Sequence, residues 1–133
     1  MAVSPTGLRL VRDRLLRLHK MLLDAERVTY ERTYGRVGSS SEWLRLVLAH
    51  EHFAWLRPMS GLIVRIDDWV ARADATTAEA EEFLVQAAAL VEPADGHQAS
   101  RLERTIADSP EGHAALEATR RAVADAQATD PAG

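Results

Sequence analysis

The sequence predicts an all-α fold, a four- to five-helix antiparallel bundle that is kinked or broken near residues 50–58. Apolar residues recur at spacings of three and four over most of the chain, which is the period of an amphipathic helix. Capping-box and Ser-Pro patterns stand where these apolar runs begin, and they are typical of helix N-termini. No run alternates apolar and β-branched residues with polar ones, so no β-sheet is expected.

The first helix is expected to begin at Ser4 and Pro5 and to end at Gly35. Serine suits the N-cap and proline the first helical position, whereas glycine supplies the left-handed residue after the helix. An apolar seam repeats over about two and a half heptads, and it consists of Leu8, Val11, Leu15, Leu18, Leu22 and Ala25. The stripe is widened by Leu16, Leu23 and Tyr30.

A second helical segment follows from about residue 40, after the capping-box pair Ser39 and Glu42. Three residues near its start are expected to face the core, namely Leu44, Val47 and Leu48. The helical spacing continues to about residue 70, but Pro58 interrupts it. Because proline donates no hydrogen bond and clashes with the preceding turn, we expect a kink or break between His50 and Pro58.

Three shorter helices are predicted over residues 78–91, 98–107 and 111–127. The first follows the capping-box pair Thr76 and Glu79, and the last follows Ser109 and Pro110. All of these helices belong to one expected domain, residues 1–127, and residues 128–133 are expected to form a frayed tail.

Composition and charge exclude several kinds of protein. The chain has no cysteine, so disulfides, thiolate metal sites and cysteine nucleophiles are excluded. Neither a secretory signal nor a long uncharged apolar run is present, which indicates a cytoplasmic protein without membrane contact. Residues 1–72 carry 12 Lys and Arg against 8 Asp and Glu, whereas residues 73–133 carry 4 against 12. The two halves are expected to attract each other in the fold, and the alternative is a basic face that binds an anionic partner. The net charge of −4 argues against nucleic acid as that partner.

A polar stripe beside the seam is the first candidate site. His19, Glu26 and Tyr30 lie on one face of the first helix, and a carboxylate there needs a buried partner. Candidate partners elsewhere are Arg57, Arg65 and Asp67. One interpretation is a hydrogen-bond network that sets the register of the first two helices. The alternative is a small polar pocket with acid–base capacity.

A second candidate lies where the helix is expected to break. His50 and His52 are two residues apart, so on a continuous helix they point in different directions, and only a break would let them share a metal ion. Trp43, Trp55 and Trp69 could line a haem pocket with a histidine as axial ligand, although aromatic residues at helical spacing are more often core.

Two segments resemble the signature segments of a small family of uncharacterised bacterial helical proteins. They are LHKMLLDAERVTYE over residues 18–31 and FAWLRPMSGLIVRIDD over residues 53–68. The resemblance implies no activity. Relatives carry Asp-Pro before the Phe-Ala-Trp element where this chain has Glu51 and His52, which implies a helix break there and argues against a shared metal site.

The chain lacks a recognisable catalytic set, because neither a nucleophile elbow nor a glycine-rich phosphate loop is present. We therefore expect a non-enzymatic binding or interaction module, with a second copy of the chain as partner. The alternative is a helical bundle that binds a small ligand, haem or a metal in a polar pocket between the first two helices; no particular cofactor is indicated. The candidate ligand-binding residues are His19, Glu26, Tyr30, Trp55, Arg57 and Asp67, and the weaker metal candidates are His50 and His52.

Overall fold

The computed structural model describes residues 4–128, which form six α-helices and one 3₁₀ segment and contain no strand. Their bounds are α1 Pro5–Tyr34, α2 Ser40–Ala49, η1 (the 3₁₀ segment) Glu51–Leu56, α3 Arg57–Ala71, α4 Thr77–Val91, α5 Gly96–Thr105 and α6 Pro110–Ala128. The all-α prediction is confirmed. The count of four to five helices is too low, because the expected break divides the second segment into α2, η1 and α3. Of the predicted tail, Ala128 ends α6, and residues 129–133 lie outside the described residues.

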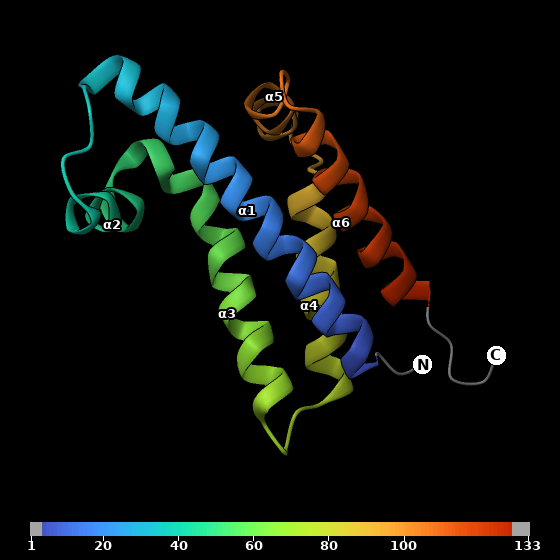
Figure 1. The fold of residues 1–133 in the computed structure, drawn as a ribbon. Coiled ribbons are helices and arrows are strands. Elements are labelled where there is room, and N and C mark those ends of the chain that lie inside the picture. The colour runs from blue at the N-terminus through green and yellow to red at the C-terminus, as the bar shows by residue number, and fades with distance from the viewer. Residues whose placement is uncertain (1–3, 129–133) are drawn as a thin grey trace.

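Four long helices form the body of the molecule. The helix α1 packs against α3 and α6, and α4 packs against the same two helices from the other side (Figure 1). Neighbouring helices in this group run in opposite directions, which is the up-down arrangement expected from short connections. The helix α5 lies at one end of the body, while α2 forms a lobe at the side of the body (Figure 1).

The caps follow the sequence signals closely. Thr76 and Glu79 form a reciprocal capping box at the start of α4. At the start of α2, the Ser39 hydroxyl accepts a hydrogen bond from the backbone N–H of Glu42 at 3.1 Å. The Glu42 carboxylate reaches the backbone N–H of Gly38, at 2.9 Å, so only half of the predicted box forms there.

The core confirms the seam of α1 but not every residue beside it. Five seam residues are fully buried, namely Leu8, Val11, Leu15, Leu18 and Leu22. Gly35 ends the helix with a φ of 92° and a ψ of 173°, a positive-φ conformation that glycine adopts readily but that lies outside the expected left-handed helical region. Leu16 does not widen the buried stripe, because its side chain is 54% exposed.

The prediction that Leu44 and Leu48 face the core is wrong. Their side chains are 58% and 65% exposed, and α2 buries none of its residues. The physical reason is that α2 turns away from the body after α1 ends and packs mainly on η1, so no core lies on that side. Within residues 4–128, no helix combines the length and apolar character that crossing a bilayer requires.

Candidate functional site

Glu26 marks the candidate site. It is the only charged residue among residues 4–128 that is buried, with 6% of its surface exposed. It follows Leu22 by four residues, so both lie on the same face of α1. The seam that fixes the orientation of α1 therefore carries this carboxylate into the interior.

Two donors meet at one oxygen of the Glu26 carboxylate. Trp55 Nε1 donates to Glu26 Oε2 at 2.8 Å, and Arg101 Nη2 donates to the same oxygen at 3.0 Å. The same Arg101 nitrogen also donates to the backbone carbonyl of His52 at 3.2 Å. Because these residues come from α1, η1 and α5, one charge-assisted cluster joins three elements.

His52 also belongs to this polar cluster, and the Trp55 ring makes a second contact with Arg101. His52 Nε2 lies 3.1 Å from the backbone carbonyl oxygen of Glu26 and 3.7 Å from its Oε2. Since a carbonyl oxygen only accepts, Nε2 is the nitrogen that carries the proton. The guanidinium of Arg101 lies over the Trp55 ring, 5.1 Å from the centroid, which adds a cation–π contact.

Tyr30 lies in an aromatic group next to this cluster. Its ring centroid is 5.2 Å from that of His50, 5.8 Å from that of His52 and 5.6 Å from that of Phe53. The break at residue 50 does bring both histidines to one element end, yet His50 Nδ1 accepts the backbone N–H of His52 at 3.0 Å. In the part of the chain that the structure describes, no group of three or more His, Asp or Glu side chains is arranged to hold a metal ion.

Arg57 stabilises the end of α2 and does not contact Glu26. Its Nε donates to the backbone carbonyl of Val47 at 3.2 Å, and its Nη2 donates to that of His50 at 2.6 Å. A cation that satisfies the last carbonyls of a helix stabilises the helix end. The prediction that Arg57 is a partner of the buried carboxylate is therefore wrong.

Asp67 also lies away from the cluster. It is exposed, and its Oδ1 accepts from Arg12 Nη1 at 2.8 Å. Because Arg12 precedes Glu26 by 14 residues on α1, the two positions are about 21 Å apart along the helix. Arg65, the third expected partner, donates to the side chain of Gln86 at 2.7 Å. The polar cluster thus joins α1 to η1, which lies in the predicted second helical segment, and it includes α5 as a third element that was not expected.

His19 lies on the same stripe but outside the Glu26 cluster. It is half-buried, and burial lowers the pKa of its imidazole below the ordinary value, while a hydrogen bond with the Leu56 backbone partly offsets this effect. A half-buried imidazole with a lowered pKa is neutral at pH 7. His19 therefore belongs to the contact between α1 and the start of α3.

Arg101 is the residue that sequence reasoning missed. It lies in a ten-residue helix, one position before the buried Leu102 and five before the buried Ile106. A long cationic side chain next to an inward-facing residue can reach the interior. The position of Arg101 beside Leu102 therefore indicated that its side chain could contribute to a buried contact. It was not enough to pair Arg101 with Glu26, because 75 residues separate them in the chain.

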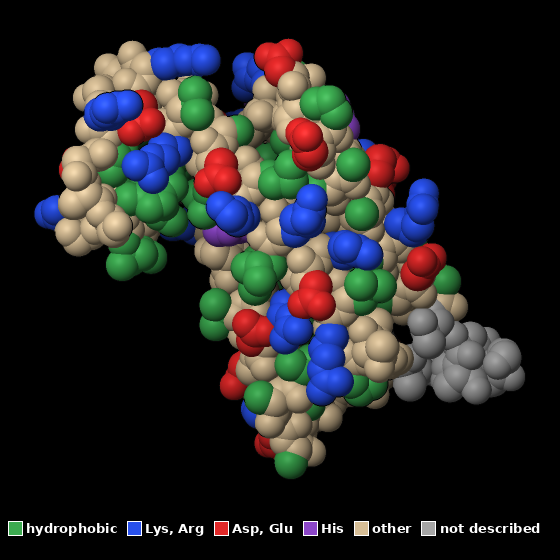
Figure 2. Space-filling view, viewed as in Figure 1, with side chains coloured by type: hydrophobic (Ala, Val, Ile, Leu, Met, Phe, Trp, Pro, Cys, Tyr) green, Lys and Arg blue, Asp and Glu red, His purple; other side chains and the backbone are tan. Residues whose placement is uncertain are grey.

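A second notable surface is the α2 ridge, which we define as the exposed side chains of Leu44 and Leu48. The two leucines are one helical turn apart, so they lie on the same face of α2. Trp43 lies on another face and is held by the protein, with the Phe53 ring 5.2 Å away and the Arg27 guanidinium 4.8 Å from its centroid. Figure 2 shows hydrophobic side chains on the lobe that contains α2.

Comparison with models of protein families, with curated proteins and with solved structures gives no match to this chain. The resemblance of residues 18–31 and 53–68 to a bacterial helical family therefore stays a prediction. The function has to be argued from the geometry of the chain itself.

Proposed function

We propose that this protein is a non-enzymatic interaction module that pairs with a second copy of itself through the α2 ridge. The observation that carries the proposal is that α2 contains no buried residue although Leu44 and Leu48 are large and apolar. A helix that leaves an apolar ridge in water is typical of a surface that another helix covers.

A second copy fits this ridge for reasons of symmetry and charge. Two identical helices in antiparallel contact place Leu44 of the first copy beside Leu48 of the second. Leu48 of the first copy then lies beside Leu44 of the second, as a twofold interface requires. The helix carries one acidic and one basic residue, Glu42 and Arg45. Its net charge is therefore zero, so the facing helices themselves add no charge repulsion.

The energy of such a contact is modest. Fully burying a leucine side chain gives about 1.5–3 kcal/mol, and these two are a little over half exposed. Each therefore contributes about 1–2 kcal/mol, and the four leucines of a dimer about 4–8 kcal/mol. Association entropy opposes this by at least about 4 kcal/mol, which leaves at most about 4 kcal/mol, so we expect a weak, reversible dimer with a dissociation constant of about 1 mM or above.

The Glu26 cluster supports a structural role in such a module. The oxygen that Trp55 and Arg101 share is buried, and both donors come from elements that the cluster holds against α1. A carboxylate engaged in this way fixes helix positions and does not present a base to a substrate.

Light scattering coupled to size-exclusion chromatography tests the proposal. The wild-type chain is expected to form a dimer as its concentration rises to a few millimolar, and the double variant Leu44→Glu, Leu48→Glu is expected to stay monomeric. The matched control is Val64→Glu, Val85→Glu, because these side chains on α3 and α4 are 65% and 56% exposed. The control should behave as the wild type does.

Two results would overturn the proposal. One is a wild-type chain that stays monomeric at every concentration up to a few millimolar. The other is a control variant that dissociates to the same extent as the α2 variant, because the contact would then not depend on the ridge.

A further inference from the structure

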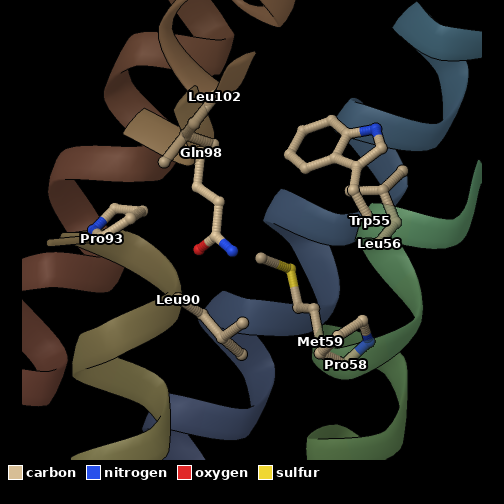
Figure 3. A pocket seen from close by; sticks show the side chains of 8 residues that line it. All are labelled: Trp55, Leu56, Pro58, Met59, Leu90, Pro93, Gln98 and Leu102. Atoms are coloured by element: carbon tan, nitrogen blue, oxygen red, sulfur yellow. The ribbon is translucent and has the colours of Figure 1, made fainter. Parts of the chain in front are cut away.

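The body of the protein contains a small pocket between two groups of elements. Trp55, Leu56 and Met59 line it from η1 and α3, while Leu90, Gln98 and Leu102 line it from α4 and α5 (Figure 3). Its volume is about 140 Å³. We infer that this pocket binds an uncharged aromatic molecule about the size of phenol, and this inference is independent of the pairing through α2.

The size of the pocket limits the ligand to a single ring. A protein cavity of about 150 Å³ with an apolar lining is known to stay dry and to bind benzene. Pockets for drug-sized ligands begin at about 300 Å³, so a haem or a dinucleotide does not fit within 140 Å³. A ligand of one six-membered ring with one or two substituent atoms matches the space.

The lining indicates that the ligand is uncharged. None of the residues that line the pocket is ionisable, and all but Gln98 are apolar. The guanidinium of Arg101 lies over the Trp55 ring, and its Nη2 is already bound to Glu26 and to the His52 carbonyl. A charged ligand would lose its hydration without a full counter-charge, which is strongly unfavourable.

Gln98 supplies the one polar contact. Gln98 is exposed, so it lies at the mouth of the pocket. Its side-chain amide points inward between Leu90 and Met59 (Figure 3), and it forms no hydrogen bond with any residue in the range 4–128. An amide both donates and accepts, so it matches a hydroxyl group, which does the same. A hydroxyl on the ring therefore finds a partner that the protein does not use.

Trp55 and Met59 favour an aromatic ring over an aliphatic one. The hydrogen bond from Trp55 Nε1 to Glu26 and the Arg101 guanidinium over its ring hold the indole in place before any ligand arrives. A fixed aromatic wall favours edge or offset contacts with another ring. The Met59 thioether adds a flexible sulfur that packs favourably on aromatic edges.

Nuclear magnetic resonance titration of the full chain tests this inference with phenol, cyclohexanol and benzoate as probes. Phenol is expected to shift the Met59 methyl and the Trp55 indole N–H signals saturably, with a dissociation constant near or below about 1 mM. Cyclohexanol and benzoate are each expected to bind at least about tenfold more weakly, because the ring of cyclohexanol is not aromatic and benzoate carries a charge.

Variants show whether the shifts come from this pocket. Leu90→Trp is expected to abolish the phenol shifts by filling the space, whereas Val85→Trp, on an exposed position of the same helix, should leave them unchanged. Gln98→Leu should weaken phenol binding up to about tenfold, the effect of one hydrogen bond, and leave toluene binding unchanged.

Several outcomes would overturn the inference. The first is a wild-type chain in which no probe gives saturable shifts at Met59 or Trp55. The second is a Leu90→Trp variant that is folded by its backbone spectrum and still binds phenol. If Leu90→Trp does not fold, the Gln98→Leu comparison decides, and equal effects on phenol and toluene would contradict the assigned contact. Equal binding of phenol and benzoate would contradict the uncharged ligand class.

Discussion

Removing the Glu26 carboxylate is expected to destabilise the protein more than removing that of Glu31, which lies five residues later on the same helix. In Glu26→Ala, the Trp55 indole N–H and the Arg101 guanidinium lose their shared acceptor. Breaking a fully buried ion pair typically costs about 3–5 kcal/mol. The Arg101 side chain is 40% exposed, so part of its charge returns to water, and we expect a loss of about 2–4 kcal/mol.

Glu31 provides the matched comparison. Its carboxylate accepts one hydrogen bond from the backbone N–H of Val37 at 2.9 Å and lies 3.8 Å from the half-exposed Arg27. We expect Glu31→Ala to cost about 1 kcal/mol, the value of one net hydrogen bond. Urea denaturation followed by circular dichroism measures both, and thermal melts should show a fall of about 8–16 °C for Glu26→Ala and about 4 °C for Glu31→Ala.

A third variant separates charge from shape. Glu26→Gln keeps an acceptor for Trp55 but removes the counter-charge of Arg101, so its stability should lie between those of the wild type and Glu26→Ala. Equal losses for Glu26→Ala and Glu31→Ala would refute the reasoning, because they would show that the buried face of α1 does not include Glu26.

Three further predictions concern histidine, the α2 end and two glycines. Because burial lowers the pKa of His19, the imidazole takes up a proton at a higher pH in the unfolded chain than in the folded one. The free energy of unfolding should therefore fall as the pH drops below about 6.5. This fall should be less steep in His19→Gln than in the control His97→Gln, which replaces an exposed histidine. Arg57→Ala should remove the side-chain donor of the Val47 carbonyl and leave the His50 carbonyl at the α2 C-cap with only the Phe53 N–H. It should raise hydrogen exchange of α2 amides about tenfold or more while α1 keeps its protection; equal exchange in both helices would contradict the local role. A Cβ at Gly112 would lie 2.9 Å from a neighbouring isoleucine, whereas one at Gly96 meets nothing within 4 Å. In urea denaturation, Gly112→Ala should lower the free energy of unfolding by about 1–3 kcal/mol, and Gly96→Ala should not lower it. A Gly112→Ala variant as stable as the wild type would refute the close packing.

Local signals in the sequence predict most of the fold. The spacing of the α1 seam, the caps at Ser4 and Thr76 and the glycine at residue 35 each act within one or two turns, so their outcome does not depend on the rest of the chain. The break near Pro58 was also predictable, because proline removes a helical hydrogen bond wherever it stands inside a helix.

The errors arise where the outcome depends on distant parts of the chain. The apolar spacing of Leu44 and Leu48 is that of a buried face, yet whether a face is buried depends on what lies opposite, and α2 turns away from the body. In the same way, the sequence shows that Glu26 needs a partner, but only the packing of α5 brings Arg101 to it. Such pairings over long separations are not encoded in any local pattern.

Label-to-label distance measurement by electron paramagnetic resonance tests the pairing through α2 most directly. The chain has no cysteine, so Arg45→Cys places a single spin label on α2 in each copy, and Arg104→Cys serves as the control on α5. At millimolar concentration the account predicts one short, well-defined distance for the α2 label, because paired helix axes lie about 8–10 Å apart. The control label should give a longer distance or none. An α2 label without dipolar coupling at that concentration would contradict the account.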